Sequence, residues 1–269
     1  MKNNLTNPFT LTVLFLLGYF SFHLLSKQII GYLYDIGYTS IDTEHTVKLF
    51  FNLFYALVAY LFIKKYELLE LAGLGKAKLK KPLFFIFPLY LAALNILNIF
   101  EIPFDNISTK SILILAVYCL SIGYAEEYIM RGFIQSLFLK HYGLTKKGIV
   151  LSVVGTSCIF GLMHLIKFDN GLWGEISQVI FATFIGTMFG AILLRTKKIW
   201  PLVIIHGLVD FFVEIDSLSP IQKIVEEPSA ESQFINSLVV VLVVLPCFIY
   251  GLVLLRKVNP ESLLLSSEH

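Results

Sequence analysis

Charged residues are scarce in this chain, and their scarcity sets its class. Asp, Glu, Lys and Arg make up 15% of the 269 residues, while hydrophobic residues make up 57%. Soluble domains carry about 25% charged and 45–50% apolar residues. The composition, with a mean hydropathy of +0.77, excludes an ordinary soluble domain and favours the membrane class. A net charge of only +2, without a basic stripe between aromatic residues, argues against a nucleic-acid partner.

Cysteine is also rare. The three cysteines, Cys119, Cys158 and Cys247, all lie in apolar runs and include no Cys-x-x-Cys pair. Their odd number and spacing argue against a disulfide framework or a thiolate metal site, so we expect small buried hydrophobic residues. No small-residue cleavage site follows the first apolar run, which predicts a retained first span rather than a removed signal peptide.

Long hydrophobic runs, by contrast, are plentiful. A helix needs roughly 20 mostly apolar residues to cross a bilayer. We therefore expect an all-α fold, a polytopic integral membrane bundle of about eight transmembrane helices, with kinks at Pro88 and Pro246. The eight expected spans cover residues 9–26, 46–63, 82–100, 111–131, 149–167, 175–194, 199–213 and 236–255.

The loops between these spans differ in basic charge. Loops on the side of the two termini hold 15 of the 21 basic residues, and the other loops hold 5. Because cytoplasmic loops are enriched in Lys and Arg, we expect both termini in the cytoplasm, an even number of spans and a multi-pass protein of the cell membrane. The 5 basic residues of the outward side are Lys27, Lys48, Lys110, Lys167 and Lys223.

Three of the apolar segments carry ionisable residues in their interiors. They begin at Glu126, Phe160 and His206 and end at Arg131, His164 and Asp210. A charge at bilayer depth costs about 2.5–3.5 kcal/mol even on the mildest scale, so such residues mark functional sites by default. Acids and imidazoles gathered in one third of the chain indicate chemistry inside a membrane.

Helical spacing sorts the residues of these segments. Glu127 and Arg131 are four apart and share a helix face, which allows a structural ion pair. Glu126 points about 100° away from that pair, and it is either a polar residue facing a wet cavity or a general base.

The two histidines also allow more than one interpretation. His164 on its own is either a hydrogen-bonded core residue or a catalytic group. His206 and Asp210 are four apart, so they form either a stabilising polar pair or a histidine oriented by its carboxylate.

The motifs Glu-Glu-x-x-x-Arg, Phe-x-x-x-His and His-x-x-x-Asp, in this order on successive spans, resemble the CPBP family of intramembrane proteases. This family includes the type II CAAX prenyl endopeptidases and the Abi bacteriocin-processing and self-immunity proteins. The resemblance covers about residues 110–214 and includes Arg131-Gly132 and Trp200-Pro201. Many members have Asn where this chain has Asp210.

The resemblance implies a role for each motif residue. Glu126 and His164 would activate the attacking water, and His206 and Asp210 would stabilise the oxyanion. An ionised Asp210 cannot donate a hydrogen bond, so it is either protonated or orients His206, and we expect orientation. Glu127 and Arg131 would support the site.

Zinc is the alternative to a metal-free site. Glu126, His164 and His206 form a His₂Glu set with a position for water, as in some zinc hydrolases. The chain has no His-Glu-x-x-His helix to pre-form such a site. A glutamate mechanism requires no cofactor, and we expect the metal-free form.

The resemblance also suggests how the chain is organised. We expect N-terminal transmembrane helices in residues 1–105 and a CPBP/Abi-like catalytic core in residues 106–214. An outward loop, the last transmembrane helix and a cytoplasmic tail follow in residues 215–269.

The expected function is an intramembrane endopeptidase acting on a membrane-associated, lipidated or precursor peptide. Prenylated CAAX proteins are the family's eukaryotic substrates. The chain's richness in Lys, Ile, Asn and Phe is typical of low-GC Gram-positive bacteria, so we expect a plasma-membrane location and a small secreted peptide as substrate. One alternative is a non-catalytic bacteriocin-immunity or scaffold protein. Another is a proton-coupled transporter, but no inverted repeat supports it.

Overall fold

The computed structural model describes residues 7–96, 99, 107–143, 145–166, 171–219 and 229–264, and all regular structure among them is helical. Six helical segments are long and apolar enough to cross a membrane. The prediction of an all-α, polytopic membrane bundle is therefore confirmed. The six segments are Pro8–Asp35, Ile41–Lys65, Thr109–Tyr142, Lys146–Met163, Gly171–Thr196 and Ala230–Arg256.

The other two predicted spans are shorter helices. Within residues 82–100, the structure has η1 (Pro82–Phe85) and α3 (Leu89–Asn95), and Pro88 is the N-cap of α3. Residues 97, 98 and 100 lie outside the described part. The seventh predicted span is α8 (Trp200–Glu214), with 15 residues. Neither α3 nor α8 reaches the roughly 20 residues needed to cross a bilayer alone.

The chain divides into two compact units, and several helices contribute to one or the other by only part of their length. The first unit contains the described residues of Met1–Phe62, Ile86–Ile129 and Trp200–Gln222. The second contains those of Ile63–Phe85, Met130–Ile199 and Lys223–His269. Lys167 and Lys223, assigned above to outward loops, lie outside the described residues.

In the first unit, local signals in the sequence start the helices. The Asn7 side chain accepts a hydrogen bond from the Phe9 amide at 2.9 Å, so it caps α1 (Pro8–Asp35). Ser108 caps α4 (Thr109–Glu127) in the same way. Such caps satisfy amides that lack a partner within the helix. The helix α2 (Ile41–Lys65) has acids in its first turn and lysines in its last, which complements the helix dipole.

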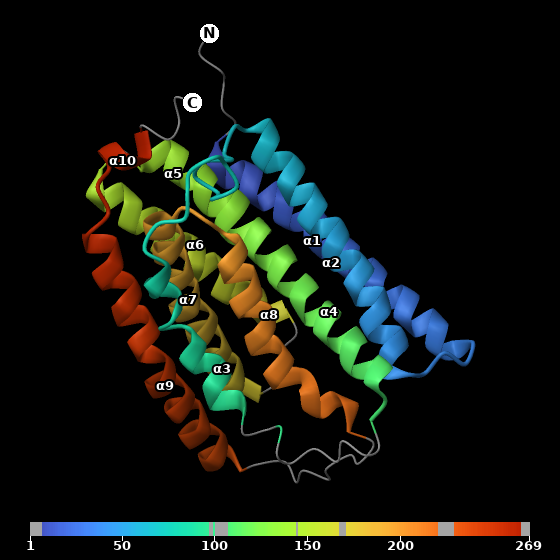
Figure 1. Cartoon of the computed structure of the whole chain (residues 1–269). Coiled ribbons are helices and arrows are strands. Elements are labelled where there is room, and N and C mark those ends of the chain that lie inside the picture. The colour runs from blue at the N-terminus through green and yellow to red at the C-terminus, as the bar shows by residue number, and fades with distance from the viewer. Residues whose placement is uncertain are drawn as a thin grey trace. The chain divides into compact units, whose positions relative to one another are not determined.

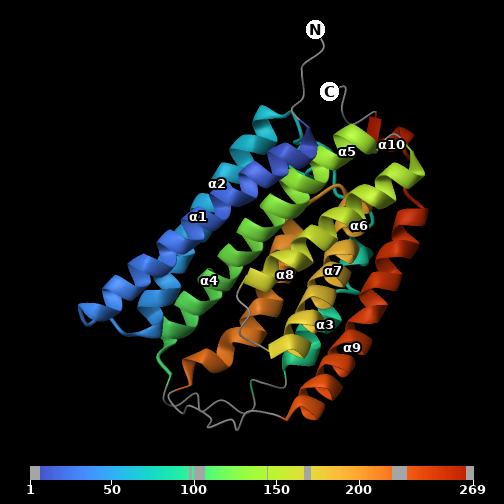
Figure 2. The same ribbon diagram turned by 180° about the vertical axis from the view of Figure 1, so that it is seen from behind.

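Aromatic contacts join α1 to α2 in this unit, and the two helices lie side by side (Figure 2). The rings of Tyr19 and Tyr55 are 4.7 Å apart between centroids, and those of Phe22 and Phe54 are 5.1 Å apart. The helix α8 packs against both α4 and α3 (Figure 1). The short helices α3 and α8 therefore bury apolar surface against each other and against a long span.

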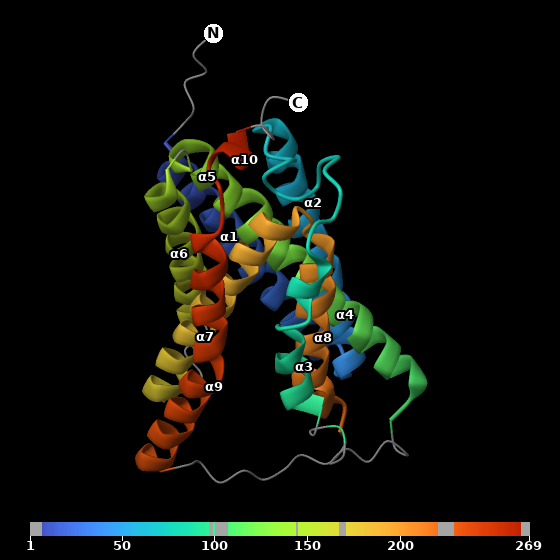
Figure 3. The same cartoon turned by 60° about the vertical axis from the view of Figure 1, so that its left-hand side comes forward.

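In the second unit, α7 (Gly171–Thr196) contacts both α6 (Lys146–Met163) and α9 (Ala230–Arg256) (Figure 3). Glycines allow these contacts: a Cβ on Gly161 of α6 would lie 2.5 Å from the Val179 carbonyl oxygen, and one on Gly251 of α9 would lie 2.9 Å from the Met188 amide nitrogen. The close packing explains why α7 is the most buried of the spans. Pro246 lies inside α9, and the kink expected there remains a prediction.

Basic loops meet at one end of the second unit. The Lys198 ammonium donates to the Gly75 carbonyl at 2.8 Å, and the Lys140 ammonium donates to the Tyr66 carbonyl at 2.9 Å. The Arg195 guanidinium donates to the carbonyl oxygen of Lys257. These loops were all assigned above to the same membrane side, and here they are hydrogen-bonded to one another.

The outer faces of the spans expose large apolar side chains. Leu14 and Leu17 of α1 are 59% and 58% exposed, and Leu242 of α9 is 57% exposed. Soluble monomers rarely present apolar surface on this scale. These faces suit contact with lipid, and the chain is a multi-pass membrane protein.

Candidate active site

The site is built on a close contact between α4 and α8 in the first unit. A Cβ on Gly123 would lie 2.5 Å from the Val203 carbonyl oxygen, and a Cβ on Gly207 would lie 2.8 Å from Leu120 Cα. Only glycine at both positions lets the two backbones approach this closely. The contact brings the carboxylates at the end of α4 to the histidine in the middle of α8.

His206 is the centre of this cluster. Its Nδ1 lies 2.8 Å from Glu127 Oε1, a hydrogen-bonding distance. Its Nε2 lies 3.5 Å from Glu126 Oε2 and 3.7 Å from Asp210 Oδ2. An ionised carboxylate only accepts hydrogen bonds, so His206 donates its Nδ1–H to Glu127 and turns Nε2 toward Glu126 and Asp210.

The carboxylates around His206 differ in burial. Glu127 is fully buried, whereas the side chains of Glu126 and Asp210 are 27% and 23% exposed. Glu127 is the carboxylate within hydrogen-bonding distance of His206, and the orienting role that the sequence suggested for Asp210 remains a prediction. Glu126 and Asp210 are the two partly exposed carboxylates of the cluster.

His164 belongs to the second unit, where it ends α6 and begins η5 (His164–Ile166). Its Nδ1 is 2.9 Å from the carbonyl oxygen of Phe160, which can only accept, so Nδ1 carries the proton. The Phe160 ring packs edge-on against the imidazole at 4.9 Å. These contacts fix the tautomer and leave Nε2 as the basic nitrogen.

Arg131 is buried in the second unit within η4, the π-helix Tyr128–Gln135. Its guanidinium carbon lies 4.7 Å from the centroid of the Phe160 ring and 5.6 Å from that of Phe189. Such contacts stabilise a desolvated cation. The ion pair with Glu127 expected from the spacing remains a prediction.

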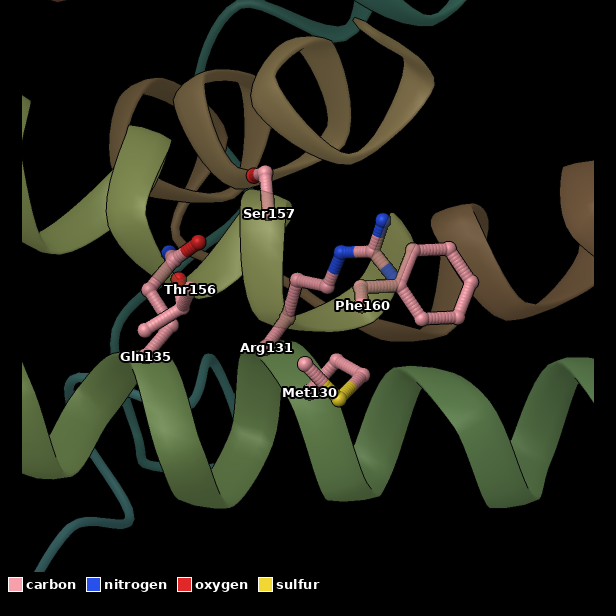
Figure 4. Close-up of a pocket in the computed structure, with 6 residues that line it drawn as sticks. All are labelled: Met130, Arg131, Gln135, Thr156, Ser157 and Phe160. Carbon is pink, nitrogen blue, oxygen red and sulfur yellow. The ribbon is translucent and has the colours of Figure 1, made fainter. Parts of the chain in front are cut away.

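A small cavity adjoins Arg131, and Figure 4 shows the guanidinium beside the Phe160 ring at this cavity. The space is too narrow to admit a water molecule. It therefore reflects the packing around a buried cation and is no substrate pocket. The residues that line it are Met130, Arg131, Gln135, Thr156, Ser157 and Phe160.

The six candidate residues from the sequence thus fall into two groups. Glu126, Glu127, His206 and Asp210 are brought together in the first unit, while Arg131 and His164 belong to the second. In the part of the chain that the structure describes, no group of three or more His, Cys, Asp or Glu residues is arranged to hold a metal ion. The choice between a zinc site and a metal-free site remains a prediction.

Part of the chain is similar to a known protein family. Residues 108–212 match the family described as type II CAAX prenyl endopeptidase Rce1-like. The chain is also similar to a protein of Bacillus subtilis (strain 168) that bears the name "Putative membrane peptidase YdiL", with 27% identity over 110 residues. The aligned part covers 41% of this chain and 39% of that relative, well under half of either. No solved structure matches the chain.

The matched residues 108–212 contain all three motifs and every residue of the His206 cluster. The helices α1 and α2 lie outside the match. The family match, the relative and the ordered motifs all make residues 108–212 similar to the CPBP family of membrane proteins.

Proposed function

We propose that the chain is an intramembrane endopeptidase that hydrolyses a peptide bond with Glu126 as general base and His206 as the oxyanion donor. The observation that carries the proposal is the His206 cluster, in which one imidazole faces three carboxylates within 4 Å between apolar helices. Membrane interiors rarely hold such a group without a functional reason.

The chemistry begins at Glu126. Its carboxylate takes a proton from a water molecule, and the water oxygen attacks the carbonyl carbon of the scissile peptide bond. The carbon–nitrogen bond of the tetrahedral intermediate then breaks, and the proton passes from Glu126 to the leaving amine. The family resemblance assigns His164 a share in activating the water, and the basic Nε2 of His164 suits that share.

His206 stabilises the negative oxygen of the intermediate. The surrounding carboxylates attract a proton to the ring by Coulomb interaction, so both ring nitrogens carry hydrogen. Nδ1–H is held by Glu127, and Nε2–H remains directed toward the space beside Glu126 and Asp210. A fixed donor of this kind typically contributes about 3–4 kcal/mol to the transition state of acyl transfer.

Asp210 contributes negative charge beside His206. Its Oδ2 lies 3.7 Å from His206 Nε2, which is beyond hydrogen-bonding distance. We propose that it stabilises the imidazolium by charge and that Glu127 fixes the orientation of the ring. Asp210→Asn therefore lowers the positive charge on His206 while Glu127 keeps the ring in place.

We propose that this reaction needs no metal ion. Every proton transfer above is assigned to a carboxylate or an imidazole of the chain. A measurement of metal content on the purified protein, with chelator treatment during the assay, decides this point. One zinc per chain, with activity lost to the chelator, would overturn the metal-free mechanism.

The proposed substrate is a peptide that reaches the site from the membrane, such as a secreted precursor or a lipidated segment. We propose a location in a bacterial plasma membrane with both termini in the cytoplasm. The support for this orientation is the basic end of the second unit, where loops of Lys and Arg are hydrogen-bonded together.

The test is cleavage of a library of quenched fluorescent peptides, some lipidated, by purified protein in detergent. Wild type is compared with Glu126→Gln, and Glu214→Gln is the matched control because it removes an exposed carboxylate at the end of α8. We expect loss of cleavage in Glu126→Gln by about a hundredfold or more and none in Glu214→Gln. Equal cleavage by both variants would refute the assignment of the base.

A further inference from the structure

Tyr55 of α2 has a hydroxyl group that the fold leaves without a partner. The side chain is 5% exposed, and its oxygen has no hydrogen-bond partner among the described residues. A buried hydroxyl without a partner costs about 1–3 kcal/mol. In native proteins such a group usually marks an internal water molecule or a ligand.

The register between α2 and α4 places Tyr55 near the candidate site. His45 of α2 stacks on Tyr118 of α4, and further along Asn52 donates to the Ser121 hydroxyl at 3.1 Å. The contacts advance along both helices in the same direction, so the helices run parallel. Tyr55 lies one turn beyond Asn52 and therefore faces the part of α4 that follows Ser121, where Glu126 lies.

A second phenol lies at the same level. The Tyr19 ring of α1 is 4.7 Å from that of Tyr55. The two phenol rings, one from α1 and one from α2, thus lie at the level of the part of α4 that follows Ser121. Glu126 Oε2 in turn faces His206 Nε2 at 3.5 Å, a separation longer than a good direct hydrogen bond.

We propose that Tyr19 and Tyr55 hold an internal water molecule beside Glu126, so that α1 and α2 complete the site of the first unit. A buried water needs two to four polar partners, and the two phenols with the Glu126 carboxylate supply three. Glu126 accepts a hydrogen bond from the water, and Tyr55 gains the partner that it otherwise lacks.

The water site itself does not depend on the proposed function. Only the role of this water in hydrolysis rests on the proposed function. In a site enclosed by apolar helices, the hydrolytic water has to be retained close to the base that activates it. Tyr19 and Tyr55 are positioning residues in this scheme, because they act through the water and not on the peptide. Both lie outside residues 108–212, so the family match does not assign them a part.

Hydroxyl-radical footprinting by X-rays tests the water directly and without a substrate. Radicals formed from an internal water modify the aromatic ring beside it, and mass spectrometry locates the product. Phe138 is the matched control because it is also 5% exposed. We expect Tyr55 to be modified on the order of tenfold faster than Phe138 because the proposed water lies beside the Tyr55 ring. Glu126→Leu should lower the rate at Tyr55 to that of Phe138.

Turnover supplies a second readout. Tyr55→Phe removes only the hydroxyl and should lower kcat about fivefold, the loss expected for one hydrogen bond, with KM unchanged. Tyr60→Phe on the exposed face of α2 is the control and should leave kcat unchanged.

The possible outcomes separate the two proposals. Slow modification of Tyr55, or a rate that Glu126→Leu does not change, overturns the water site whether or not the protein is a peptidase. Fast modification of Tyr55 together with full activity in Glu126→Gln overturns the proposed function and leaves the water site standing.

Discussion

Gly123→Ala tests the contact on which the site depends. The new Cβ would lie 2.5 Å from the Val203 carbonyl oxygen, whereas ordinary contact begins at 3.4 Å. The helices α4 and α8 must therefore separate by 3.4 minus 2.5, about 0.9 Å, and overpacking of this kind costs about 1–3 kcal/mol. The same shift stretches the 2.8 Å bond between His206 and Glu127 beyond hydrogen-bonding distance. We expect activity to fall about a hundredfold, as for other catalytic groups displaced by 1 Å.

Gly18→Ala is the matched control, since nothing lies within 4 Å of a Cβ at that position of α1. Thermal unfolding in detergent, followed by intrinsic fluorescence, measures stability, and cleavage of the most active library peptide measures turnover. Gly18→Ala should be at least as stable as wild type because alanine favours a helix by about 1 kcal/mol over glycine. If Gly123→Ala unfolded at the same temperature and cleaved at the same rate as Gly18→Ala, the close contact of α4 and α8 would be disproved.

Three further substitutions probe buried charge. Glu127→Ala removes the acceptor of the His206 Nδ1–H and should lower the free energy of unfolding by about 3 kcal/mol, as measured by thermal unfolding. An unchanged midpoint temperature would contradict the pairing of His206 with Glu127. Arg131→Lys should lower the free energy of unfolding by about 2 kcal/mol because an ammonium cannot stack on two rings. An equally stable variant would show that the stacking of Arg131 does not stabilise the fold. Burial and the nearby Lys80 lower the pKa of Lys197 below its usual 10.5. The unfolded chain then binds more protons, so stability should rise as pH increases toward 10.5. Lys197→Gly removes the ammonium and should abolish this rise with pH. Because Lys197 has a left-handed φ of 63°, the change to glycine should also add about 1 kcal/mol to the free energy of unfolding. A rise with pH that persisted in Lys197→Gly would refute the assignment of the rise to Lys197.

Hydropathy predicted the six long spans because each contains a stretch of 18 mostly apolar residues. It also found the residues of α3 and α8, but it could not give their lengths. In the region of α3, Pro88 and the 3-10 turn of η1 interrupt an apolar run, and hydropathy alone does not register such a break. The helix α8 ends at Glu214, and η6 (Ile215–Leu218) follows it directly.

The site could be predicted in part. The spacing of four between His206 and Asp210 predicted their shared face, and they lie 3.7 Å apart. The partner of His206 at 2.8 Å is Glu127 from another helix, and no spacing within one helix could indicate it. The glycines Gly123 and Gly207 were the only signal in the sequence that α4 and α8 approach closely. Tyr55 gave no signal, because a tyrosine in an apolar span is ordinary until its hydroxyl is seen to lack a partner.

Glu126 is proposed to activate water for peptide hydrolysis, and this step can be followed in the product. The most direct measurement is the single-turnover rate of wild type and Glu126→Gln in H₂¹⁸O, with the products weighed by mass spectrometry. We expect wild type to place one ¹⁸O in the new carboxyl terminus and Glu126→Gln, at equal folded concentration, to form this product about a hundredfold more slowly or not at all. Formation of the ¹⁸O product at the wild-type rate by Glu126→Gln would contradict it.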